Sequence, residues 1–197
     1  MIAVVDYGAG NTGSVLKAAR HLGRSAVRAE DAGLLPQAQK IILPGQGHFG
    51  SMMQALGERQ MIQPLRAAIA ASTPFLGICL GLQMLYEASE EAPEVAGLGL
   101  LAGRVRRFDG VFKVPHVGWN RLSILGPSRI LRGIATGSFV YYCHSYYGPV
   151  TPEAAAVTEY GQRYSAALEK DNVWAVQFHP EKSGDVGLSV LNNFLDI

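Results

Sequence analysis

Two hydrophobic patterns alternate along the first half of the chain. Short apolar runs of three to five residues are typical of strands buried on both faces of a sheet. Between these runs, apolar residues return at every third or fourth position, as in helices that cover a sheet. The predicted strands are residues 2–5, 26–29, 41–43 and 75–78, and the predicted helical regions are residues 11–21 and 52–69. This alternation predicts a largely parallel sheet with helices on both faces.

After about residue 92 the pattern changes to β-rich segments that are joined by Gly and Pro, with little room for helices between them. These segments are residues 98–108, 114–125, 138–147, 154–160, 164–169 and 173–178, and a closing helix is predicted over residues 184–196. Such a pattern predicts an antiparallel extension of the sheet. The expected fold class is therefore α/β: a three-layer sandwich with a mixed, mostly parallel central sheet.

Composition narrows the class of protein. With 197 residues, 48% of them apolar, the chain can bury one sizeable core, so residues 1–197 are expected to form a single domain. The net charge is +1 and the longest basic cluster is residues 104–107, so no nucleic-acid partner is expected.

The cysteine spacing and the lengths of the apolar stretches indicate where in the cell the protein is expected. Cys79 and Cys143 lie far apart without CxxC spacing, which indicates a reducing compartment. No leader pattern and no apolar stretch of membrane-spanning length is found, so a cytoplasmic protein without a membrane partner is expected.

The apolar run 75–78 ends at Cys79, with glycines two residues before and two residues after it. From Leu80 the apolar positions follow helical spacing, so Cys79 is predicted to lie on a turn from strand to helix. Small flanking residues allow the strained turn that raises a nucleophile above a sheet, and the helix start would favour the thiolate. Although a free cysteine is often a core residue, this pattern favours Cys79 as a nucleophile.

A cysteine nucleophile needs a base, and His179 is the best candidate because it follows the apolar segment 173–178 at a strand end. In extended backbone, residues i and i+2 project to the same side, so Glu181 can accept a hydrogen bond from the imidazole and orient it. Pro180 stiffens the pair. The predicted catalytic residues are therefore Cys79, His179 and Glu181. The alternatives are a capped loop residue for His179 and a solvated charge pair of Glu181 with Lys182.

Thiolate attack on an amide creates an oxyanion that needs preorganised donors. One candidate is the N–H of Leu80, next to the nucleophile. The other is the loop 44–47, Pro-Gly-Gln-Gly, where glycines allow a peptide N–H to turn inward. An ordinary strand-ending turn is an equally good interpretation of this loop.

One motif favours a different function. Residues 8–13 fit G-x-G-x-x-G between a predicted strand and a helix, and Glu30 and Asp31 follow about twenty residues later, as in dinucleotide-binding proteins. A nicotinamide-dependent oxidoreductase is therefore a rival hypothesis. However, 197 residues would hold the cofactor domain and little else, and the predicted triad would have no task. We expect no cofactor.

Other polar and aromatic residues give weaker signals. Cys143, His144 and His116 lack a recognised zinc spacing, so no metal site is expected. Trp119 and Trp174 are most simply core residues, but an exposed Trp119 would indicate a partner surface.

The chain resembles the class I, triad-type glutamine amidotransferases over nearly its whole length, through residues 76–83 (LGICLGLQ) and 179–181 (HPE). Within that family it is similar to the glutaminase subunits of imidazole glycerol phosphate synthase. The signatures that carry this likeness are residues 6–11 (DYGAGN), 44–47 (PGQG), 115–120 (PHVGWN) and 179–183 (HPEKS).

The resemblance implies a glutaminase in which Cys79 attacks the side-chain amide of glutamine, His179 moves the proton and Glu181 orients the imidazole. Water then releases glutamate. The ammonia would pass through a tunnel into a cyclase subunit, a (β/α)₈ barrel that forms a heterodimer with the glutaminase. The cyclase would use the ammonia to convert a phosphoribulosyl formimino intermediate to imidazole glycerol phosphate and an aminoimidazole carboxamide ribotide, in histidine biosynthesis.

The resemblance also implies binding roles. Gln83 and the backbone around Ser145 and Tyr146 would hold the amino-acid end of glutamine. Gly45 and Gln46 would form a switchable oxyanion strand. Gln46 stands where the family usually has Val, so its side-chain amide could stabilise either orientation of that strand.

The same resemblance places Asn11, Trp119 and Lys182 toward the cyclase. Val117 stands where Met is usual, away from the triad. Two more classes stay open at this point: a cysteine peptidase or related hydrolase with the same elbow, and a non-catalytic interaction module.

Overall fold

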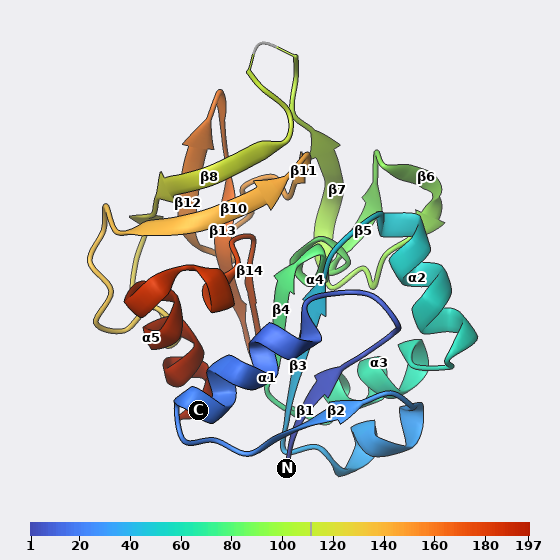
Figure 1. The fold of residues 1–197 in the computed structure, drawn as a ribbon. Helices are drawn as coiled ribbons and strands as arrows, with labels where there is room; N and C mark the ends of the chain where they lie inside the picture. Colours follow the sequence, from blue (N-terminus) through green and yellow to red (C-terminus); the bar gives the residue numbers. More distant parts are fainter. Residues whose placement is uncertain (111) are drawn as a thin grey trace.

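A computed structural model describes residues 1–110 and 112–197 of the chain, and an eight-stranded sheet runs through it in the order β2-β1-β3-β4-β14-β13-β12-β9 (Figure 1). The first five strands in this order are mutually parallel: β2 (Ala26–Ala29), β1 (Ile2–Val5), β3 (Lys40–Gly45), β4 (Phe75–Cys79) and β14 (Val173–Val176). The last three are antiparallel: β13 (Gln162–Lys170), β12 (Ala154–Tyr160) and β9 (Ser123–Ile124).

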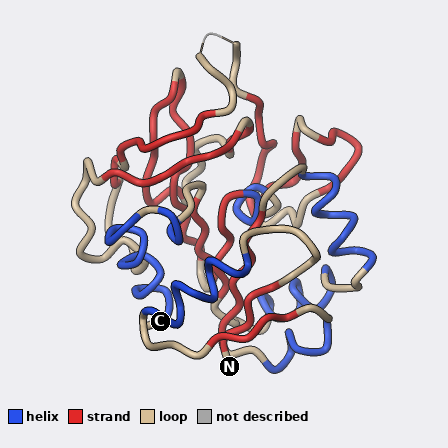
Figure 2. The backbone as a smooth tube through the Cα atoms, viewed as in Figure 1, coloured by secondary structure: helices blue, strands red, loops and turns tan. Residues whose placement is uncertain are grey.

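Helices cover both faces of this sheet, with the strands between them (Figure 2). One face carries α1 (Thr12–His21) and α5 (Gly184–Leu195), and the other carries η1 (Ala32–Gln37), α2 (Phe49–Glu58) and α3 (Ile62–Ala70). Successive side chains of β1 alternate between the two cores: Ala3 and Val5 pack with α2 and α3, whereas Val4 packs with α1 and α5. Continuous apolar strands are therefore buried on both sides, and the three-layer α/β prediction is confirmed.

The predicted antiparallel extension is confirmed in part. Strands β13, β12 and β9 continue the central sheet, but six other strands form two smaller sheets. The β8–β10 ribbon pairs β8 (His116–Arg121) with β10 (Phe139–His144), and the second small sheet has the order β11-β7-β5-β6. Its strands are β11 (Tyr146–Tyr147), β7 (Leu101–Arg107), β5 (Tyr86–Ser89) and β6 (Ala92–Ala96).

The helix predicted after Cys79 is a single turn, α4 (Leu80–Gln83), and the prediction of a longer helix is wrong. The backbone of residues 84–86 hydrogen-bonds to a distant segment instead of continuing the helix. The carbonyl of Met84 accepts from Leu98 at 2.7 Å, and the carbonyl of Leu85 accepts from Leu100 at 2.8 Å. These tertiary hydrogen bonds satisfy the carbonyls at the helix end. The apolar residues that follow therefore enter β5 and do not extend the helix, although their spacing is helical.

The helical region predicted over residues 52–69 is divided into α2 and α3. Gln60 has φ +55°, a left-handed conformation that ends α2. Pro64 follows in the first turn of α3, where its missing N–H needs no partner. The two helices therefore pack as separate segments on the same face of the sheet.

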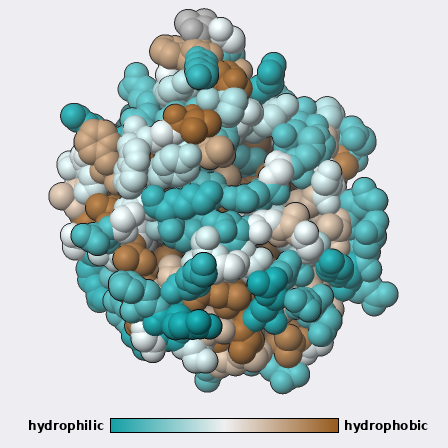
Figure 3. All heavy atoms as spheres, in the orientation of Figure 1, coloured by the Kyte–Doolittle hydropathy of each residue, from teal (hydrophilic) through white to brown (hydrophobic). Residues whose placement is uncertain are grey.

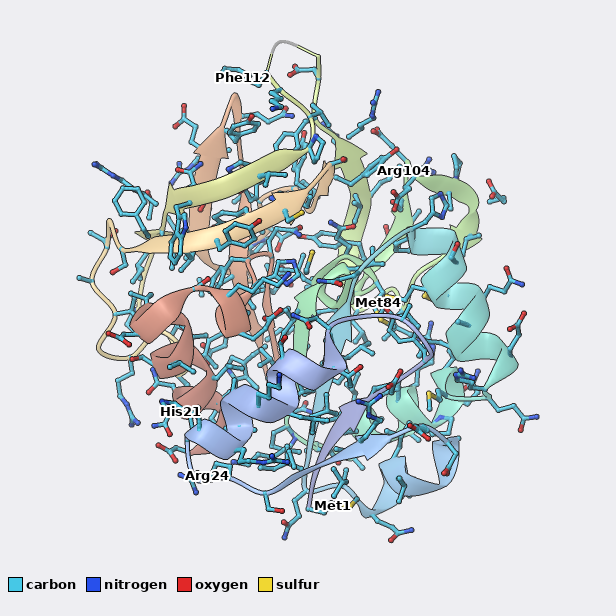
Figure 4. The ribbon with its side chains drawn as sticks, in the orientation of Figure 1. Met1, His21, Arg24, Met84, Arg104 and Phe112 are labelled. Atoms are coloured by element: carbon cyan, nitrogen blue, oxygen red, sulfur yellow. The ribbon has the colours of Figure 1, made fainter. Side chains whose placement is uncertain are left out.

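The carboxyl ends of β3, β4 and β14 lie side by side, because Gly45 is opposite Cys79 and Val176 is opposite Ile78. Met1, His21 and Arg24 lie at the other end of the molecule, away from β8 and β10 (Figure 4). Among the described residues, none of the helices has the length and apolarity needed to cross a membrane. The fold thus gathers the carboxyl ends of three parallel strands at one edge, where parallel sheets place their sites.

Candidate active site

Cys79 lies on a strained turn between β4 and α4. Its backbone has φ +56° and ψ −106°, which is costly for a residue with a side chain and persists only where the surroundings enforce it. The residue is 5% exposed, yet it lines a surface pocket of about 400 Å³. The turn that was predicted from the flanking glycines is therefore present.

The flanking glycines are needed because backbone packs directly on backbone here. A Cβ added to Gly77 would lie 2.5 Å from the carbonyl oxygen of Gly81, and one added to Gly81 would overlap the carbonyl oxygen of Leu43. A Cβ at Gly45 would lie 2.6 Å from the Cβ of Leu80. Substitution at any of the three glycines would push β3, β4 and α4 apart. The close packing of these three elements therefore fixes the position of Cys79.

His179 and Glu181 form a buried pair at the carboxyl end of β14. Nδ1 of His179 lies 3.0 Å from Oε1 of Glu181, and the two side chains are 2% and 1% exposed. The two side chains meet as expected but for a different reason: only His179 is extended (φ −97°, ψ 97°), whereas Pro180 and Glu181 begin the 3₁₀ turn η2 (Pro180–Lys182). The amide of Asn11 donates a second hydrogen bond to the same carboxylate oxygen at 3.0 Å, a contact that was not predicted.

The protonation of this pair follows from its neighbours. Burial alone would lower the pKa of His179, but the charge and hydrogen bond of Cys79 and the contact with Glu181 outweigh it and raise this pKa to about 10. Burial opposes ionisation of Glu181, but the hydrogen bond and charge of His179 lower the pKa of the carboxyl below its usual value, with a contribution from Asn11. The imidazole is therefore protonated and the carboxylate ionised at neutral pH.

Gln177 contacts the nucleophile and was missed as a site residue. Its amide Nε2 donates to Sγ of Cys79 at 3.6 Å, and its Oε1 accepts from the amide of Gln83 at 3.2 Å. Gln83 also donates to the carbonyl of Tyr146 at 2.8 Å. Gln177 lies in a bend directly after β14, which ends at Val176, so its contact with the sulfur depends on the tertiary structure and had no signal in the sequence spacing.

The pocket collects most of the residues that were predicted to bind glutamine. Its lining includes the predicted residues Gln46, Cys79, Leu80, Gln83, Ser145, Tyr146 and His179. Glu91, Pro115, Cys143 and His144 line it as well and were not predicted as site residues. The pocket holds a nucleophile, an imidazole and amide groups within a volume suited to an amino acid.

The loop after β3 lies next to the nucleophile. Gly45 is opposite Cys79 in the parallel pairing of β3 with β4, and Gln46 follows it at the pocket wall. The N–H of Gln46 donates to the hydroxyl of Tyr7 at 3.2 Å. Leu80 follows Cys79 directly at the first position of α4. Both predicted sources of oxyanion donors are therefore adjacent to the sulfur, but the Gln46 N–H is already engaged.

The first glycine of the segment 8–13 already contacts other groups of the protein. The N–H of Gly8 donates to the carboxylate of Asp6 at 2.9 Å, and the space where a Gly8 Cβ would lie is 2.7 Å from the guanidinium of Arg59. The protein itself therefore occupies the N–H of Gly8 and the space beside this glycine. These contacts argue against the dinucleotide hypothesis.

The outer face of the β8–β10 ribbon is apolar and exposed. Trp119 is 55% exposed and Val117 is 56% exposed, and the Trp119 ring contacts Tyr141 at 6.2 Å between centroids. In Figure 3 pale and brown surface interrupts the hydrophilic surface over this part of the molecule. Lys182 is exposed on η2 (Pro180–Lys182), which packs against β10 and α1, and Asn11 immediately precedes α1. The three residues predicted to face a partner are therefore carried by neighbouring elements.

The inner face of the same ribbon holds two neutral histidines. Burial lowers the pKa of His116 to about 4 and that of His144 to about 3. His116 stacks on Tyr160 with centroids 4.0 Å apart. Within residues 1–110 and 112–197, no three His, Cys, Asp or Glu side chains are grouped as a metal site would require. His116 is a core residue of the ribbon, whereas the buried His144 also lines the pocket.

Comparison with known proteins gives a consistent result. The family model for class I glutamine amidotransferases matches residues 3–197. The chain is 47% identical over 198 residues to the imidazole glycerol phosphate synthase subunit HisH of Methanothermobacter thermautotrophicus, covering 100% of this chain and 98% of that protein. It is 45% identical over 208 residues to the subunit of the same name from Syntrophotalea carbinolica, covering 100% of both.

Solved structures share the fold. A crystal structure of a glutamine amidotransferase superposes with a TM-score of 0.78 at 19% identity, covering 100% of this chain and 98% of that one. The structure of PurLQS from Thermotoga maritima gives a TM-score of 0.75 at 20% identity, covering 99% of this chain and 97% of that chain.

Proposed function

Because the chain belongs to the class I glutamine amidotransferases, we propose that it hydrolyses glutamine to glutamate and ammonia as the glutaminase subunit of imidazole glycerol phosphate synthase. Two full-length relatives named as HisH subunits of that synthase are 47% and 45% identical to it. The observation that carries the proposal is the strained Cys79 in a pocket shared with His179, whose imidazole is hydrogen-bonded to Glu181.

Glutamine would bind with its amino-acid end against Gln83, Ser145 and Tyr146. These residues lie on the pocket wall, and the amide of Gln83 is held in place by Gln177 and the carbonyl of Tyr146. An amide group fixed in this way presents its remaining polar atom in one direction, which favours a single orientation of the substrate. The side-chain amide of glutamine would then point toward Cys79.

In the first step the sulfur of Cys79 attacks the carbonyl carbon of the glutamine side chain. The protonated imidazole of His179 stabilises negative charge on the neighbouring sulfur, and it donates its proton to the leaving nitrogen, so that the C–N bond breaks and ammonia departs. A thioester remains on Cys79. Glu181 orients the ring and stabilises its positive charge.

In the second step water hydrolyses the thioester. Neutral His179 accepts a proton from the water as its oxygen bonds to the carbonyl carbon, and the C–S bond then breaks to release glutamate. The sulfur and the imidazole return to their starting states. Both steps pass through an oxyanion, for which the N–H groups of Leu80 and of the Gly45–Gln46 strand are the proposed donors.

The ammonia would be passed to a cyclase subunit, a (β/α)₈ barrel, with which the chain forms a heterodimer in the cytoplasm. The exposed face of the β8–β10 ribbon supports this contact because large exposed aromatic side chains are typical of the energetic centre of an interface. Trp119 would anchor the cyclase, with Asn11 and Lys182 beside it. The cyclase would use the ammonia to form imidazole glycerol phosphate and an aminoimidazole carboxamide ribotide in histidine biosynthesis.

The test is glutamine hydrolysis by the purified chain with and without the cyclase subunit and its phosphoribulosyl ligand. We expect slow hydrolysis by the chain alone, because the Gln46 N–H is engaged by Tyr7. Addition of the liganded cyclase should raise the rate by orders of magnitude. Absence of glutamate formation in the liganded complex would overturn the proposed function.

A further inference from the structure

The hydroxyl of Tyr7 contacts both polar groups of Gln46. It accepts the N–H of Gln46 at 3.2 Å and donates toward the carbonyl oxygen of the same residue at 3.5 Å. The two residues are 39 positions apart and lie on the loops after β1 and β3. One side chain therefore holds the backbone of the loop that borders the nucleophile.

Tyr7 has little freedom to move away from this position. Its side chain is 2% exposed, and Asp6 beside it accepts hydrogen bonds from the N–H of Gly8 at 2.9 Å and from Arg28 at 2.6 Å. Gly10 adopts φ +99°, and a Cβ there would lie 3.4 Å from the Tyr7 hydroxyl. Burial raises the pKa of Tyr7 to about 12, so its hydroxyl stays neutral and can donate and accept at once.

The held peptide lies where the reaction needs a donor. Gly45 is opposite Cys79, and Gln46 and Cys79 line one pocket, whereas Tyr7 is absent from the residues that line it in the described part of the chain. A peptide N–H carries one hydrogen. While it is directed at Tyr7, it cannot also make a well-aligned bond to an oxyanion formed at Cys79.

The same loop reaches the triad. Asn11, four residues after Tyr7, donates to the carboxylate that orients His179. Residues 6–11 therefore contact both the predicted oxyanion strand and the carboxylate that orients the predicted base. A partner that bound over Asn11 would act on both contacts through one segment.

We propose that Tyr7 is a positioning residue that holds the Gln46 peptide with its N–H directed away from the pocket, and that this contact limits glutamine hydrolysis by the chain alone. The inference rests on the proposed glutaminase function and assigns the slow hydrolysis expected of the chain alone to one hydroxyl group. Release of the contact lets the peptide turn and supplies the second oxyanion donor.

The variant Tyr7→Phe removes the hydroxyl and keeps the buried ring. Because one oxyanion donor contributes about 10²–10³ in kcat, partial release should raise kcat of the chain alone about tenfold, with little change in KM. The maximal rate with the liganded cyclase should be unchanged, so the activation ratio should fall by the same factor. The matched control is Tyr142→Phe, which removes the buried hydroxyl that contacts Thr158 at 2.6 Å. It should leave the rate of the chain alone unchanged.

Hydrogen exchange of the Gln46 amide separates this inference from the proposed function. Exchange should be faster in Tyr7→Phe than in the wild type and in Tyr142→Phe, whether or not the chain hydrolyses glutamine. Tyr7→Met should behave in the same way if the Phe variant folds poorly. An unchanged or lower basal rate in a folded Tyr7 variant, or unchanged Gln46 exchange, would overturn the role of Tyr7. Failure of the wild-type complex to hydrolyse glutamine would instead reject the function.

Discussion

Nδ1 of His179 and Oε1 of Glu181 lie 3.0 Å apart, and both side chains are almost fully buried. A buried carboxylate in this position fixes which imidazole nitrogen carries a proton and stabilises the imidazolium. The opposite ring nitrogen is then free to serve the sulfur of Cys79. Two residues that are only two positions apart in sequence thus form the contact on which the proposed proton transfer depends.

The variant Glu181→Gln tests this relationship. The amide keeps the size of the side chain but loses the charge, so we expect kcat for glutamine in the cyclase complex to fall by about two to four orders of magnitude, with KM changed little. Glu94→Gln, at an exposed position on β6, is the matched control and should retain full activity. Wild-type kcat in Glu181→Gln would contradict the orienting role.

The raised pKa of His179 predicts how stability depends on pH. The folded value of about 10 lies above the ordinary value of 6.5. The stability that this group contributes is therefore fully present below about pH 6.5 and is lost as the pH rises toward 10. In Glu181→Gln the pKa of His179 should fall, and the loss should end at a lower pH. NMR titration of His179 and urea unfolding between pH 6 and pH 10 measure both effects. A His179 that titrates at or below 6.5 in the wild type would contradict the prediction.

The packing of the elbow predicts a contrast between two glycines. Gly81→Ala should lower the free energy of unfolding by about 1–3 kcal/mol and reduce activity, because the new Cβ overlaps the Leu43 carbonyl beneath Cys79. Gly13→Ala, in the first turn of α1, meets nothing within 4 Å. It should be neutral or stabilise the chain by up to about 1 kcal/mol. Urea unfolding measures both, and equal effects would contradict the account of the turn.

The exposed ribbon predicts the position of the partner. Trp119→Ala should weaken binding of the cyclase by about 2 kcal/mol or more, roughly thirtyfold in Kd, if Trp119 lies at the centre of the interface. Val27→Ala is the control, because Val27 is 37% exposed on the edge strand β2 at the opposite side of the sheet. It should leave Kd unchanged. Calorimetric titration with the cyclase tests the pair, and unchanged binding by Trp119→Ala would exclude this face.

The central sheet could be predicted because its strands are buried on both faces and are therefore continuously apolar. The run 75–78 and the strand 2–5 are examples. Strands β7, β8, β10 and β11 lie within predicted β-rich segments, but their division into two small sheets was not predicted. Strand β5 was missed, because Tyr86 continues a helical pattern in sequence and its backbone instead pairs with residues 99–101. The spacing of apolar residues indicates which face of an element is buried, but it does not indicate which backbone groups form hydrogen bonds with residues distant in sequence.

In the pocket, too, some contacts could be predicted from the sequence and others could not. The contact of Glu181 with His179 could be predicted from their separation of two residues, although Glu181 lies in a 3₁₀ turn and not in extended backbone. Gln177 could not be predicted, because its contact with Cys79 joins the ends of β14 and β4. Tyr7 could not be predicted, because its contact with Gln46 joins two loops that are adjacent only after β1 and β3 pair. The sequence spacing therefore predicts contacts within the short segment that follows one strand. Contacts between segments that follow different strands are known only from the structure.

The most direct test of the account uses Cys79→Ala in complex with the cyclase, assayed for imidazole glycerol phosphate formation from two nitrogen sources. If the chain generates ammonia from glutamine by nucleophilic attack of Cys79, synthesis from glutamine should be abolished and synthesis from added ammonium salts should be retained at the wild-type rate. Undiminished synthesis from glutamine would contradict the role of Cys79, and loss of both activities would contradict a separate ammonia-generating function for this chain.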